Sequence, residues 1–181
     1  MIFTPTPLEG AWLIDVEPHR DARGFFARTV CVQSFLDKGI DGRFVQQSVS
    51  WNPKAGTLRG MHFQTSEHSE DKLVRCTRGR IHDVIIDLRS GSASRGRWFA
   101  VELSAENRRQ LWVPRGFAHG FQTLEDGCEV LYEMTRPFVA GASMGIRWDD
   151  PAIGIHWPIE VADHDPSRLS HADANWPKWT P

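Results

Sequence analysis

Turn-forming residues recur at short intervals along the middle of this chain, and they leave room only for short segments between them. Small clusters containing glycine or proline fall at 53–56, 78–79, 90–91, 114–116 and 126–127. The intervening runs are rich in β-branched and apolar residues, as is typical of strands. The runs predicted to be strands are 73–77, 81–88, 98–103, 109–113, 120–124 and 129–134. Many short strands with such turns indicate an all-β sandwich or barrel.

Helix is predicted in few places. The best candidate runs from Val32 to Lys38, with Gly39 placed to end it as a C-cap. Residues 104–108 are expected to form one short turn, and the proline-containing tail from about residue 151 is expected to be mostly irregular. A length of 181 residues suits a single domain with one core, so residues 1–181 are predicted to form one unit.

Composition excludes several classes of function. The net charge is -2, and lysine and arginine form no basic block, which argues against binding to nucleic acid. No apolar run reaches the length of a membrane span, and the first residues lack the layout of a signal peptide. The cysteines Cys31, Cys76 and Cys128 are far apart and form no CxxC pair, so a cytoplasmic, reduced protein is expected.

The sharpest local pattern is Pro114–His119, a Pro-x-Gly turn with a histidine three residues after the glycine. It resembles the second conserved motif of cupins, which are small jelly-roll barrels. The region that corresponds to the first cupin motif offers His62 and then Gln64, where metal-binding cupins carry a second histidine. A transition-metal site needs about three converging ligands. His62 and His119 alone do not supply them, so no metal is expected.

Several further motifs, in order along the chain, resemble the dTDP-4-dehydrorhamnose 3,5-epimerase family. They are Arg23–Phe26, Leu58–Gln64, Lys72–Cys76, Leu103–Arg108, Val113–Phe121 and Trp148–Pro158. The resemblance runs from about residue 8 to about residue 177. It implies an all-β, cupin-type jelly-roll barrel (a double-stranded β-helix) with short peripheral helices. It also implies a homodimer that needs no cofactor and in which N-terminal strands are exchanged between the subunits.

The resemblance also implies a chemistry. The family acts on a nucleotide-linked 4-keto-6-deoxyhexose, in which the C4 ketone acidifies the C–H bonds at C3 and C5. By resemblance His62 is the base, and Asp173 holds its ring in one tautomer. Lys72 would stabilise the enolate oxygen, and Tyr132, the one tyrosine of the chain, would return a proton on the opposite face.

Each of these four residues also has a purely structural interpretation. His62 could be a hydrogen-bonded histidine of the barrel, and Lys72 could be a solvated charge that follows an acidic stretch. Tyr132 could direct its hydroxyl to solvent, and Asp173 could be a turn residue of a polar tail.

The resemblance assigns further residues to substrate binding. Arg23 and Arg59 fall at positions that bind the diphosphate, for which guanidinium groups are well suited. Gln47 lies near a nucleotide contact, with the alignment open by one residue. His119 is a candidate anchor for a phosphate or a sugar hydroxyl. The two aromatic candidates, each with a structural alternative, are Phe26 and Phe138.

The chain departs from the family pattern at several recognition positions. Arg28 stands where a glutamate is usual, Phe138 replaces a tyrosine, and Ser143 replaces a glutamate. Ala172 replaces a lysine, and Ser48 lies where the nucleotide contact has changed. These departures predict intact enolisation with altered specificity, such as another nucleotide base, another keto sugar, or epimerisation at only one carbon.

Three other functions are compatible with the sequence. A non-catalytic, sugar-binding cupin would have little need of a base, an acid and a lysine together. A keto-sugar isomerase of a sister branch would share the histidine base but generally lacks the Arg-Gly-x-His-Phe context. A metal-dependent cupin would require the ligand set that the spacing lacks.

Overall fold

The computed structural model describes residues 1–180, and most of its regular structure is strand. The strands are β1 (Ile2–Pro5), β2 (Trp12–Asp15), β3 (His19–Asp21), β4 (Gly24–Phe26), β5 (Gln46–Asn52), β6 (Leu58–Gln64), β7 (Lys72–Arg78), β8 (Arg80–Asp87), β9 (Trp98–Ser104), β10 (Gln110–Val113), β11 (Phe117–Thr123), β12 (Cys128–Met134) and β13 (Ser143–Gly145). The helices are α1 (Val32–Leu36), η1 (Ala140–Ala142) and α2 (His171–Ala174). None of the helices in this part of the chain is long and apolar enough to cross a bilayer.

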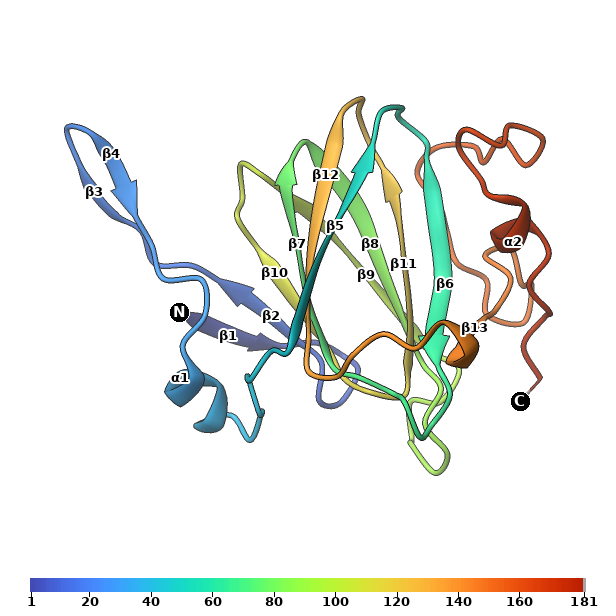
Figure 1. Cartoon of the computed structure of the whole chain (residues 1–181), viewed down its shortest axis with the longest axis horizontal. Helices are drawn as coiled ribbons and strands as arrows, with labels where there is room; N and C mark the ends of the chain where they lie inside the picture. The colour runs from blue at the N-terminus through green and yellow to red at the C-terminus, as the bar shows by residue number, and fades with distance from the viewer. Residues whose placement is uncertain (181) are drawn as a thin grey trace.

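Two antiparallel sheets face each other and enclose the interior of the barrel (Figure 1). One sheet has the order β1-β2-β10-β7-β12-β5, and the other has the order β13-β6-β11-β8-β9. Neighbours in the sheets are often distant in sequence, as in a jelly roll. The all-β, jelly-roll prediction is therefore confirmed.

The core between the sheets consists of apolar side chains from the inner face of each strand. Its buried members include Val74, Ile85, Leu111, Phe121 and Val130. In β8 the alternate residues Val84 and Ile86 are also fully buried, but they belong to a second cluster. β8 is therefore covered on both faces, which explains why its sequence is almost continuously apolar.

Irregular segments cover the outer faces of both sheets. Helix α1 packs Phe35 against Ile14, Leu73 and Trp112 of the six-stranded sheet. The C-terminal tail runs along the outer side of β6, on the right in Figure 1, and covers the second cluster. A parallel bridge between Leu58 and Leu169 fixes the tail to β6. The tail is irregular apart from α2, as expected.

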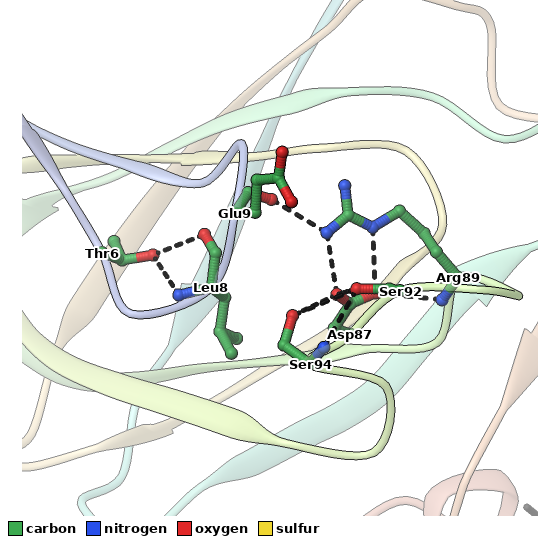
Figure 2. Close-up of polar contacts among 7 residues, drawn as sticks. All are labelled: Thr6, Leu8, Glu9, Asp87, Arg89, Ser92 and Ser94. Atoms are coloured by element: carbon green, nitrogen blue, oxygen red, sulfur yellow. Dashed lines mark hydrogen bonds and ion pairs between the residues drawn. The ribbon is translucent and has the colours of Figure 1, made fainter.

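Asp87, a carboxylate without solvent exposure, organises the connection between β8 and β9. It accepts hydrogen bonds from Arg89 at 2.8 and 2.9 Å and from the hydroxyls of Ser92 and Ser94 at 2.6 and 2.7 Å. Arg89 also donates to the carbonyl of Glu9 at 2.9 Å (Figure 2). The cluster thus joins the N-terminal turn to the end of β8.

The six predicted strands are all present, with ends that differ by a few residues. The predicted helix is present as α1, and Gly39 lies just after it at φ 74°, the left-handed conformation of a C-cap. Strands β5 and β6 were not predicted, and neither were the short strands β1, β3, β4 and β13. The inward positions of β5 are polar, and β6 contains Gly60, so neither segment shows an apolar strand pattern.

Candidate active site

Two glycines bring neighbouring strands close together at the centre of the candidate site. A Cβ atom on Gly60 would lie 2.7 Å from the Cα of Gly120, and one on Gly120 would lie 2.7 Å from the carbonyl of Arg59. Only glycine permits this approach of β6 to β11. In the same register His62 lies opposite His119, and an irregularity follows between His119 and Phe121. The glycines in the motifs around both histidines are therefore needed for the close approach of the two strands.

His62 is paired with a carboxylate from the C-terminal tail. Its Nε2 lies 2.5 Å from Oδ1 of Asp173, although 111 residues separate the two in sequence. Asp173 is only 5% exposed, and its own amide donates to the hydroxyl of Ser170, the N-cap of α2. With Nε2–H donating to the carboxylate, Nδ1 is the ring nitrogen that can accept a proton.

The electrostatics of this pair favour an ionised Asp173. Burial raises the pKa of the carboxyl, but the hydrogen bond and charge of His62 and a hydrogen bond from Trp176 lower it further than burial raises it. The net pKa of Asp173 lies below its ordinary value. The aspartate is thus a fixed negative charge beside the histidine near neutral pH.

A second histidine–aspartate pair lies deeper in the barrel. Nε2 of His119 is 2.8 Å from Oδ1 of Asp83. His119 is 4% exposed, and Asp83 of β8 has no exposure at all. A fully buried carboxylate on an apolar strand needs a partner of this kind. Asp83 therefore fixes the orientation of the His119 ring.

Tyr132 approaches the histidines from the opposite sheet. Its ring meets that of His119 edge to face, with centroids 5.8 Å apart. Burial, followed by the charge of Asp83, raises the pKa of the Tyr132 phenol far above its usual value. The phenol therefore stays protonated at physiological pH and can serve as a proton donor.

Two cationic side chains complete the wall of the site. Nζ of Lys72 lies 2.9 Å from Glu70, and only 14% of the lysine side chain is exposed. Nε of Arg59 donates to the Asn52 side chain at 2.7 Å. Lys72 is therefore not a solvated surface charge, and both cations are held in place by neighbours.

These side chains surround one cavity of about 270 Å³ between the two sheets. It is lined by Ser48, Val49, Ser50, Arg59, His62, Lys72, His119, Phe121 and Tyr132. Five of the ten residues predicted to form the site thus line the same cavity. Asp173 does not line it but is hydrogen-bonded to His62, which does.

The other four predicted residues lie outside this cavity within the single chain. Arg23 and Phe26 belong to the β3–β4 hairpin, which projects away from the barrel in Figure 1. The Arg23 side chain is 89% exposed and paired with Asp21, and Phe26 is 75% exposed. Gln47 is on the outer face of β5, where it donates to Glu133. Phe138 follows β12 and is 54% exposed.

Sequence reasoning missed the residues that hold the site in place, above all Asp83, Glu70 and Asn52. Asp83 offered a usable pattern, because it occupies an inward position between Ile81 and Ile85. A carboxylate in a buried apolar run indicates a paired or functional group. Glu70 and Asn52 lie in ordinary polar surroundings of the sequence, and no comparable pattern distinguishes them.

The fold and the site together define a class of protein. A jelly-roll barrel encloses a base supported by a carboxylate, a protonated phenol on the facing sheet and a buried lysine. These are the parts of an enzyme that moves protons to and from carbon. Residues 5–180 match the sequence profile of dTDP-4-dehydrorhamnose 3,5-epimerases, and the chain belongs to that family.

Known proteins of the family are similar along nearly the whole chain. The dTDP-4-dehydrorhamnose 3,5-epimerase of Methanothermobacter thermautotrophicus is 45% identical over 96% of this chain and 92% of its own. The crystal structure of the Elizabethkingia anophelis enzyme has a TM-score of 0.92, with 35% identity over 99% and 96% of the two chains. The Legionella pneumophila enzyme, solved with dTDP-4-keto-L-rhamnose, has a TM-score of 0.89, with 34% identity over 98% and 92%.

Proposed function

We propose that this chain epimerises a dTDP-4-keto-6-deoxyhexose at C3 and C5, converting dTDP-4-dehydro-6-deoxyglucose to dTDP-4-dehydrorhamnose. The observation that carries the proposal is the placement of His62 and Tyr132 on facing sheets across one cavity. A sugar ring held between the sheets presents one face to the imidazole and the other to the phenol. Inversion at carbon requires this arrangement, since the proton leaves one face and returns to the other.

The remaining residues of the cavity account for the rest of the reaction. His62 takes the proton of the C–H bond on Nδ1, and Asp173 stabilises the imidazolium that forms. The electron pair moves into the C4 oxygen, where Lys72 and His119 stabilise the negative charge. Tyr132 donates its proton to carbon from the opposite side and is reprotonated by solvent, and the His62 imidazolium releases the proton that it removed to solvent, which restores the base. Arg59 is placed to bind a phosphate oxygen at the edge of the cavity.

Solvent deuterium tests this proposal directly. The protein is incubated in D₂O with dTDP-4-keto-6-deoxyglucose, and the sugar protons are followed by NMR. Deuterium at both C3 and C5 with inversion is the expected result. Deuterium at one carbon only would identify a mono-epimerase, which the changed recognition residues Arg28 and Phe138 would then explain. Absence of exchange with this and other 4-keto sugar nucleotides would reject the epimerase function and favour a sugar-binding protein.

We also propose that the active form is a homodimer in which the β3–β4 hairpin completes the partner's site. The hairpin exposes the side chains of Phe25, Phe26 and Arg23. No residue of the hairpin lines the His62 cavity of its own barrel. An isolated two-stranded hairpin is marginally stable in water. Seating against a second copy would cover its apolar side chains and bring Arg23 to the diphosphate.

Complementation between two inactive variants tests the exchange. Arg23→Ala and His62→Asn chains are purified separately and then refolded together. With exchange, a mixed dimer contains one intact site, so about a quarter of the wild-type activity returns on random pairing. If each hairpin served its own barrel, no mixture would regain activity.

The three cysteines of the chain are unpaired thiols, which suits our assignment of the protein to the reducing cytoplasm.

A further inference from the structure

Asp173 has a second hydrogen-bond donor besides His62, and it comes from an aromatic residue of the same tail. Nε1 of Trp176 donates to Oδ1 of Asp173 at 3.2 Å, the same oxygen that binds Nε2 of His62. The indole also meets the His62 ring edge to face, with centroids 6.3 Å apart. Trp176 therefore contacts both members of the pair.

The indole is seated on the backbone of a neighbouring strand. A Cβ atom on Gly145 would lie 2.4 to 2.5 Å from three atoms of the Trp176 ring, so the ring lies directly over this glycine. Gly145 is in β13, and in the sheet it pairs with His62. The absence of a side chain at position 145 thus places the indole beside the histidine and its carboxylate.

We propose that Trp176 is a positioning residue for the His62–Asp173 pair, which fixes the carboxylate and limits the negative charge that it presents to the imidazole. The inference rests on the proposed function for its kinetic consequences. Its physical basis is the shared oxygen, because an acceptor that already binds one N–H donor attracts the proton of a second donor less strongly. Hydrogen bonds to the partner of a functional histidine commonly set the orientation and basicity of its ring.

Loss of the indole N–H has a defined consequence for proton transfer. With Oδ1 free to interact with His62 alone, the protonated imidazole is stabilised, and a smaller fraction of the enzyme holds the base form near neutral pH. The acid limb of the kcat profile should therefore move to higher pH. The carboxylate also loses one of the contacts that fixes its plane. Substrate binding should be nearly unchanged, because Trp176 does not line the cavity.

Trp176→Phe is the informative variant, because it keeps an aromatic ring over Gly145 and removes only the N–H. We expect kcat to fall about 10-fold at pH 7 with KM nearly constant, and the acid limb to shift upward. Trp179→Phe is the matched control, since Trp179 belongs to the same tail but packs on Gly96 and lies away from the pair. A purely structural role would lower the thermal midpoint of Trp176→Phe without moving the profile, and that result would overturn the proposal.

A second variant and a second readout separate this proposal from the function itself. Gly145→Ala leaves Trp176 in the chain but displaces its ring, and it should shift the acid limb in the same direction. The ring protons of His62 are titrated by NMR without substrate in Trp176→Phe, Gly145→Ala and the control Trp179→Phe. The His62→Asn spectrum serves only to assign these signals. An upward shift of the midpoint supports the positioning role even if the protein epimerises no sugar. Wild-type midpoints in Trp176→Phe and Gly145→Ala would overturn it even if the enzyme is active.

Discussion

Gly60 and Gly120 lie against each other on adjacent strands, and the site depends on this contact. A Cβ atom on Gly120 would lie 2.6 Å from Sδ of Met61 and 2.7 Å from the carbonyl of Arg59. Gly120→Ala should destabilise the fold by roughly 3 kcal/mol, because backbone atoms must move apart. Urea unfolding measures this cost. Gly141→Ala, where a Cβ meets no atom within 4 Å, should change stability by less than about 0.5 kcal/mol. Equal stability of the two variants would contradict the close approach.

Lys72 should matter for turnover more than for folding. Lys72→Met removes the cation at the developing enolate, and kcat should fall roughly 10²- to 10³-fold. The single change also leaves Glu70 buried beside Gln64 without its lysine. Lys72→Met/Glu70→Gln removes both charges and serves as the control for folding. If the double variant recovers both stability and activity, Lys72 has no role in the chemistry.

Tyr132→Phe should separate proton removal from inversion. The phenylalanine keeps the ring that packs on His119 and removes only the proton that the phenol would deliver. His62 should still exchange the substrate proton with solvent, so deuterium enters with retention while the epimerised product forms slowly. NMR in D₂O follows both processes in one sample. Unchanged inversion would assign the returning proton to another group.

Asp87 should make the fold sensitive to acid. Burial raises the pKa of this carboxyl, but hydrogen bonds from Arg89, Ser92 and Ser94 outweigh burial and hold it well below its usual range. A carboxyl with a lowered pKa stabilises the folded state fully above about pH 4, and this contribution is lost as pH falls towards the folded-state pKa.

Asp87→Asn tests that sign. It should lower the free energy of unfolding at pH 7 by about 2 kcal/mol, less than for a fully buried pair because part of Arg89 is exposed. Below pH 4 its stability should depend less on pH than that of the wild type. Urea unfolding across pH 3 to 7 gives both quantities. Asp21→Asn, in an exposed pair with Arg23, should leave the pH dependence nearly unaltered.

The six predicted strands all have mainly apolar inward positions. Strand β8 is an example, since both of its faces are covered. Strand β5 was missed because its inward residues Ser48 and Ser50 are polar and line the cavity of the candidate site. The same alternation explains why Gln47 lies outside the cavity. A shift of one residue along a strand moves a side chain to the other face, and Gln47 is on the outer one.

The members of the site that lie within motifs could be predicted, and their supporting partners could not. His62 and His119 are brought together by glycines that are themselves part of the motifs. The partnership of Asp173 with His62 spans 111 residues, and only the docking of the tail on β6 reveals it. Local patterns do not encode such contacts, which is why Asp173 was predicted by resemblance alone.

In the proposed reaction His62 removes the proton beside the ketone. Wild type and His62→Asn are compared in D₂O with dTDP-4-keto-6-deoxyglucose, with binding of dTDP as a check on folding. His62→Asn should bind dTDP normally and incorporate deuterium at C3 and C5 at least about 10³-fold more slowly than wild type. Exchange at the wild-type rate in a correctly folded His62→Asn protein would contradict this role of His62.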